Sequence, residues 1–66
     1  MLYVGQSPVY YKGVIVAHYI VEQAKSGFYY VWRTDYKMRK LRNVGSYQYK
    51  EDALDMAARY AIIASL

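Results

Sequence analysis

Two runs of β-branched and aromatic residues, separated by a short segment that ends in glycine, constrain the fold of this chain more than any other feature. The first run is Val14–Gln23 (VIVAHYIVEQ) and the second covers residues 28–34 (FYYVWRT). Such side chains favour the pleated surface of a sheet, and short glycine-containing loops commonly join antiparallel strands. The pattern predicts a β-hairpin with residues 24–27 as a four-residue loop.

A loop of this length places Gln23 opposite Phe28, and the period of two along each strand then assigns every side chain to a face. One face is wholly apolar or aromatic, so we expect it to pack on a helix. It holds Ile15, Ala17, Tyr19, Val21, Phe28, Tyr30 and Trp32. The other face is mixed, so we expect it to meet solvent or a ligand. It holds His18, Ile20, Glu22, Tyr29, Val31 and Arg33.

The segment before this hairpin is less regular. Residues 2–4 and 9–11 are expected to form short strand pieces, because Gly5, Ser7 and Pro8 interrupt the run and proline is confined to sheet edges and turns. Residues 12–13 (Lys-Gly) are predicted to form a turn, since glycine adopts positive φ without strain.

A third main strand is expected at residues 38–47, after a turn at residues 35–37, with an irregularity near Asn43 and Gly45. Residues 50–65 then show the apolar period of an amphipathic helix. Their acidic side chains lie in the early turns, where the helix dipole favours negative charge. The positions expected to face the sheet are Ala53, Met56, Ala57, Tyr60, Ile63 and Ala64.

Together these elements predict an α+β fold in one domain of residues 1–66. A three- to four-stranded antiparallel sheet at about residues 2–47 packs on one C-terminal helix at about residues 50–65. A chain of 66 residues without cysteine has no disulfide and no thiolate zinc site to reinforce a thin core. Neither a signal peptide nor a membrane-spanning segment is recognisable, so we expect a soluble, cytoplasmic protein with no membrane partner.

The residues that usually carry catalysis are sparse. His18 is the single histidine, so no histidine or cysteine cluster is available to bind a metal. No glycine-rich phosphate loop is present, and no serine lies in a nucleophile-elbow context. We therefore expect a protein that is not an enzyme, with no catalytic residues, no cofactor and no metal.

Charge and aromatic residues point instead to binding. The net charge is +4, and residues 37–42 (KMRKLR) hold four basic side chains in six positions. Aromatic rings interleaved with basic side chains are typical of nucleic-acid binding proteins, and also of protein interfaces. The residues expected to contact a partner are Arg33, Lys37, Arg39, Lys40, Arg42, Tyr29 and Tyr36.

Two segments show a family resemblance. Residues 44–53 (VGSYQYKEDA) resemble the strand-to-helix junction of plant ethylene-response-factor (apetala-type) DNA-binding domains, and residues 11–14 (YKGV) look like the opening of that family's first strand. Phage-integrase arm-binding domains share the architecture. The resemblance implies a three-stranded sheet on one helix that lies in the DNA major groove, with Arg33, Arg39 and Arg42 as backbone contacts.

The function that we expect first is nucleic-acid binding, with duplex DNA as the ligand, through the helix-free face of the sheet and the basic third strand. The alternative is a small phage- or bacteria-type interaction module that docks on, or inhibits, a larger protein complex. Such a module would meet an acidic protein surface. A third hypothesis is a homo-oligomer, a dimer that buries the aromatic face of the sheet.

Overall fold

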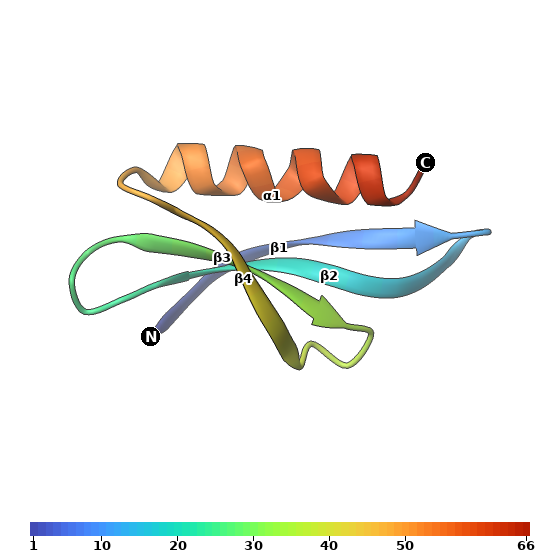
Figure 1. The fold of residues 1–66 in the computed structure, drawn as a ribbon, viewed down its shortest axis with the longest axis horizontal. Helices are drawn as coiled ribbons and strands as arrows, with labels where there is room; N and C mark the ends of the chain where they lie inside the picture. Colours follow the sequence, from blue (N-terminus) through green and yellow to red (C-terminus); the bar gives the residue numbers. More distant parts are fainter.

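The chain forms one open antiparallel sheet with a single helix across one face (Figure 1). The computed structural model describes all residues, 1–66. The elements are β1 (Leu2–Tyr11), β2 (Val14–Gln23), β3 (Tyr29–Asp35), β4 (Lys40–Tyr47) and α1 (Lys50–Ala64). The strands are ordered β1-β2-β3-β4, so β1 and β4 are the two edges. The predicted α+β architecture is confirmed, with four strands and the helix at the C-terminal end.

The β2–β3 loop is one residue shorter than the sequence predicts. Ala24 and Phe28 already pair across the hairpin, because the Ala24 N–H donates to the Phe28 carbonyl at 2.9 Å. The loop is therefore residues 25–27, and Gly27 adopts the left-handed conformation with φ 95°. Three-residue hairpin loops typically place glycine at this position.

This shorter loop exchanges the two faces of β3. Gln23 pairs with Tyr29, not Phe28, and Val21 pairs with Val31. Tyr29, Val31 and Arg33 therefore lie on the helix side, whereas Tyr30 and Trp32 lie on the opposite face. The predicted facing of β3 was wrong, because a one-residue change of register inverts every side chain of a strand.

The predicted helix side of β2 is confirmed for Ala17, Tyr19 and Val21, which are all buried. Ile15, in contrast, is 40% exposed. The register between β1 and β2 shifts between Val9 and Tyr10, so that Ile15 pairs with Tyr10. This shift turns the Ile15 side chain away from the face that α1 covers.

β1 is one continuous strand and not two short pieces. It absorbs its irregular sequence through a register shift between Tyr3 and Gly5. A side chain on Gly5 would meet the Leu54 side chain at 2.9 Å, so glycine here allows a close approach of α1. The predicted turn at residues 12–13 is confirmed. Lys12 (φ 51°) and Gly13 (φ 80°) both have positive φ, as a tight hairpin turn of two residues requires.

β4 begins at Lys40, two residues later than predicted, because residues 36–39 form the turn. Leu41 and Val44 have no partner on β3, and the register shifts at these two residues. The shift at Val44 lies where an irregularity was expected, between Asn43 and Gly45. Bulges of this kind increase local twist. In Figure 1 the β3–β4 end accordingly swings away from α1.

α1 rests on the sheet through a stripe of alanines. Ala53, Ala57 and Ala61 are each at most 4% exposed and pack against the buried valines of the sheet. Because alanine is small, the helix backbone approaches the strands closely. Ile63 is 66% exposed and Ala64 is also exposed. The predicted burial of these last two positions was wrong, since the buried stripe repeats every four residues from Ala53.

We predict that Ala57→Leu destabilises the protein by about 1–3 kcal/mol, because there is no space for three extra carbons between helix and sheet. Urea unfolding followed by circular dichroism measures the change. Ala64→Leu adds the same atoms at an exposed position and serves as the control. A loss of stability for Ala64→Leu as large as that for Ala57→Leu would contradict this account of the packing.

Candidate functional site

The positive charge of the protein is concentrated in one part of the fold. We call residues 29–47, which comprise β3, β4 and their turn, the basic hairpin. It carries five of the nine basic side chains and one of the five acidic ones, a net charge of +4. The remaining four basic and four acidic side chains cancel. The whole net charge of +4 therefore resides on the basic hairpin.

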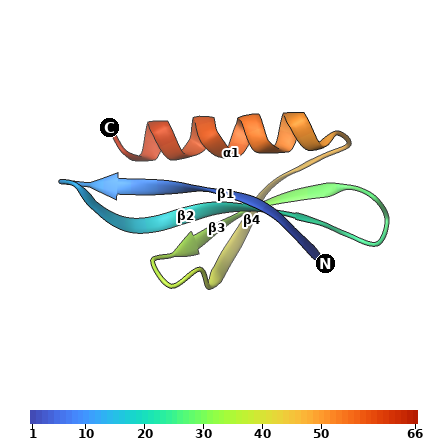
Figure 2. The same cartoon turned by 180° about the vertical axis from the view of Figure 1, so that it is seen from behind.

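The turn of the basic hairpin lies far from the helix. In Figure 1 and Figure 2, which are opposite views, the β3–β4 turn lies on the side of the molecule opposite α1. α1 packs mainly over β1 and β2. The helix therefore does not cover the β3–β4 turn.

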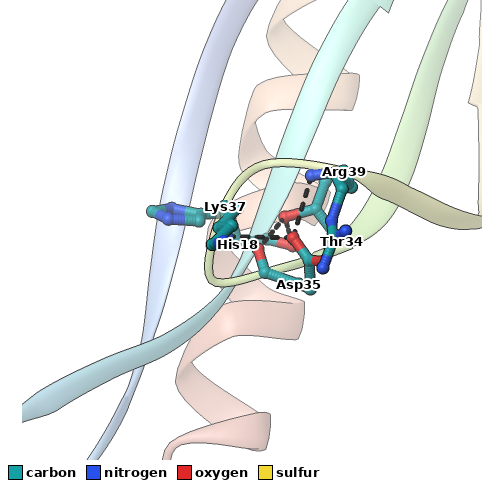
Figure 3. A network of polar contacts seen from close by, with 5 residues as sticks. All are labelled: His18, Thr34, Asp35, Lys37 and Arg39. Carbon is teal, nitrogen blue, oxygen red and sulfur yellow. Dashed lines mark hydrogen bonds and ion pairs between the residues drawn. The ribbon is translucent and has the colours of Figure 1, made fainter.

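Asp35 organises this turn (Figure 3). Its Oδ1 accepts hydrogen bonds from the backbone N–H groups of Lys37 (2.9 Å) and Arg39 (3.0 Å). Its Oδ2 accepts a third from Nε of Arg39 at 2.6 Å. An aspartate that bonds backbone N–H groups two and four residues later stabilises a tight turn. This allows Met38 to adopt a φ of 68°, which non-glycine residues rarely do.

The same contacts change the acidity of Asp35. The hydrogen bond from the Arg39 backbone N–H lowers the pKa of the Asp35 carboxyl below its usual 3.8, and partial burial opposes this. The guanidinium of Arg39 and the backbone N–H of Lys37 lower the pKa further. Each of these donors favours the charged carboxylate.

Arg33 and Arg42 face each other across β3 and β4 on the helix side of the sheet. Arg33 is partly fixed, because its Nη1 donates to the Tyr19 hydroxyl at 3.1 Å and its guanidinium lies 5.1 Å from the centre of that ring. The Tyr19 ring in turn stacks on Tyr60 of α1 at 5.4 Å. Arg42 has no acidic partner. Like charges directly opposite each other in a sheet are destabilising, so the pairing of Arg33 with Arg42 lowers the stability of the fold.

Lys40 lies on the other face. Its Nζ is 3.0 Å from Oε1 of Glu22 and 4.9 Å from the centre of the Trp32 ring. Trp32 and Glu22 were not among the residues predicted for the site. The incorrect register placed Trp32 on the helix side, and Glu22 was predicted on the mixed face but is acidic. With the observed register, Glu22 and Trp32 lie on one face of the sheet, and the register shift at Leu41 brings Lys40 to the same face.

The turn holds the other predicted basic residues. Arg39 pairs with Asp35, while Lys37 has no acidic partner and lies over the ring of Tyr36 at 5.6 Å. Tyr36 is 60% exposed. Tyr29 is at the opposite end of β3, where it pairs with Tyr47 and packs against the core. The structure therefore brings together all five predicted basic residues and Tyr36, but not Tyr29.

A buried contact lies directly behind the turn. Thr34 is fully buried, and its hydroxyl donates to the carbonyl of His18 at 3.3 Å. Nδ1 of His18 and Nε1 of Trp32 are buried without a hydrogen-bond partner. His18 is thus part of the support beneath the turn, and no cluster of three or more metal-ligating side chains is found in the structure.

No protein-family model, curated protein or solved structure matches this chain in the comparisons made with known proteins. α1 is too short and too polar to cross a membrane as a helix.

We predict that Asp35→Asn destabilises the protein at neutral pH and that the deficit shrinks as the pH falls below about 3.8. The folded-state pKa of Asp35 is lowered, so its contribution is present above the unfolded-state value and is lost as acid protonates the carboxylate. Urea unfolding of both proteins between pH 7 and pH 2 measures this difference. Asp55→Asn is the control, because its carboxylate forms an exposed ion pair with Arg59, and such pairs contribute little. A deficit for Asp35→Asn that is independent of pH would contradict the prediction.

Proposed function

We propose that this protein binds nucleic acid, with duplex DNA as the ligand, through the turn end of the basic hairpin. The observation that carries the proposal is the location of the charge: the entire net +4 lies on this hairpin. Phosphate contacts from lysine and arginine supply most of the affinity of such proteins. The side chains that we assign to these contacts are Lys37, Arg39, Lys40 and Arg42.

The distribution of these side chains over both faces favours insertion into a groove. Arg42 lies on the helix side of the hairpin, whereas Lys40 lies on the opposite side. A flat sheet surface would use only one of them. The major groove of DNA accommodates a two-stranded β-ribbon, and it has a phosphate backbone along each wall. A ribbon with cations on both faces suits that shape.

This arrangement differs from the one first expected from the sequence, in which the helix-free face lies flat on the ligand. The resemblance to apetala-type domains supports Arg39 and Arg42 as phosphate contacts within the present proposal. Arg33 is assigned a smaller share, because Tyr19 already holds its guanidinium. Tyr36, exposed beside Lys37, supplies a ring and a hydroxyl that can reach the sugar-phosphate backbone.

We predict that random-sequence duplex DNA binds with an affinity that falls roughly 100-fold between about 50 and 200 mM salt, as four phosphate contacts would require. Fluorescence anisotropy measures the affinity at each salt concentration. Poly-glutamate of matched charge is titrated in parallel. Equal or tighter binding of poly-glutamate would replace nucleic acid with an acidic protein as the partner. No binding to DNA at the lower salt concentration would overturn the proposal.

We further predict that changing Lys37, Arg39, Lys40 and Arg42 together to glutamine abolishes DNA binding. The chain offers a matched control, because Lys12, Lys25, Lys50 and Arg59 are the four basic residues outside the basic hairpin. Both quadruple variants have the same net charge of zero, since each loses four positive charges from +4. The control should keep most of the affinity and most of the salt slope. Equal loss in both variants would show that only total charge matters, and would refute the assignment of the site.

A further inference from the structure

The two edges of the sheet differ in how they are protected from pairing with another strand. Exposed edges present unpaired N–H and C=O groups, and charged side chains and bulges normally block them. Both edge strands have two register shifts, but only β4 also carries charge, on Lys40 and Arg42. β1 has no charged residue in its ten positions, Leu2–Tyr11. The β1 edge therefore lacks the protection that charge gives to β4.

Half of the β1 edge is closed by other means. The N–H of Tyr10 points away from β2, since it donates to Oγ of Ser65 at the end of α1 at 3.0 Å. The backbone groups of Pro8 and Gln6 point the same way by alternation along the strand. Pro8 has no N–H to offer, whereas Gln6 has a free N–H and C=O. Up to Gln6 the edge can therefore offer both donors and acceptors, whereas Pro8 and Tyr10 offer outward carbonyls alone.

An apolar groove continues the edge beside its closed half. It has a volume of about 440 Å³ and lies between β1 and the last two turns of α1. Its lining contains no charged side chain and consists of Ser7, Pro8, Tyr10, Ala58, Ala61, Ile62, Ser65 and Leu66. At the open end of the strand, Leu2 is 69% and Tyr3 is 56% exposed. The strand thus has exposed apolar side chains at one end and an apolar groove at the other.

We propose that the open part of the β1 edge and this groove bind a second copy of the same chain. Antiparallel pairing about a two-fold axis at Gln6 places Gln6 opposite Gln6 of the second copy. It also brings the Leu2 and Tyr3 end of each strand to the outward carbonyls and the groove at the other end of its partner. Each copy then supplies the apolar side chains and the groove that its partner requires, as a two-fold interface demands.

The charge distribution supports a second copy as the occupant. Two molecules of charge +4 repel each other, but all of that net charge lies on the hairpin that forms the opposite edge of the sheet. Association through β1 keeps the two basic hairpins at the outer edges of the joined sheet. A domain of this size also leaves much apolar surface uncovered, and dimerisation would cover part of it. This inference is independent of the proposed function.

The test is the mass of the protein without nucleic acid, by sedimentation equilibrium. We expect a dimer near 1 mM that dissociates on dilution to about 1 µM, as mass action requires. Gln6→Lys should weaken the dimer at least about tenfold, because it places like charges beside the two-fold axis. Leu41→Lys is the matched control, since it adds the same charge at an exposed position of β4. A monomer at the highest concentration, or equal effects of the two variants, would overturn the proposal.

Cross-linking gives a second readout, because the chain has no cysteine of its own. In paired antiparallel strands, facing Cα atoms are about 4.5–5.5 Å apart, which a disulfide spans. Gln6→Cys should therefore form a covalent dimer under mild oxidation, while Leu41→Cys, on the opposite edge, should not. A covalent dimer from Leu41→Cys alone would assign the contact to β4 instead. Because DNA is absent from both experiments, their failure would leave the proposed function untouched.

Discussion

The register between β2 and β3 determines most of what this small structure presents to its surroundings. It is set by a loop of three residues that ends in Gly27, whose φ of 95° closes the hairpin one residue earlier than a four-residue loop would. With this register Val21 and Val31 meet under the helix and are both fully buried. The same register sends Trp32 to the opposite face, where Lys40 reaches it from β4. The pairing of the core valines and the exposure of Trp32 to Lys40 are thus consequences of one turn.

The helix contributes through the small side chains on its buried face. Three alanines four residues apart form its buried face, so α1 lies close to the strands and covers chiefly β1 and β2. A helix with leucines at these positions would sit higher and shield more of the sheet. The narrow cover has two effects: the turn end of the β3–β4 hairpin remains accessible, and large apolar side chains stay exposed at both ends of β1. A core built mainly from valine and alanine therefore leaves surface available for binding.

Sequence reasoning recovered the element order, the bounds of β2 and the position of α1, because these depend on local residue preferences and on the apolar period. It failed on the faces of β3, because the loop length was wrong by one residue. Gly27, at the position where three-residue loops place a left-handed residue, is the local signal that was missed. It also divided β1 at Gly5, Ser7 and Pro8. The sequence does not reveal that the strand lies at an edge of the sheet, where the missing N–H of a proline costs nothing. The basic residues of the proposed site were chosen from their spacing, whereas the contacts of Lys40 with Glu22 and Trp32 depend on pairing across strands.

The separation of charge within the fold makes the molecule an electric dipole. Positive charge is gathered on the β3–β4 hairpin, while Glu51 and Asp52 lie in the first turn of α1. In the field of a polyanion such a molecule experiences a torque before any contact forms, and it turns so that the hairpin leads. Orientation of this kind raises the fraction of diffusional encounters that are productive, and dissolved salt weakens it over distances of about 10 Å. The unequal placement of a few charged side chains can thereby affect how fast a partner is found, separately from how tightly it is held.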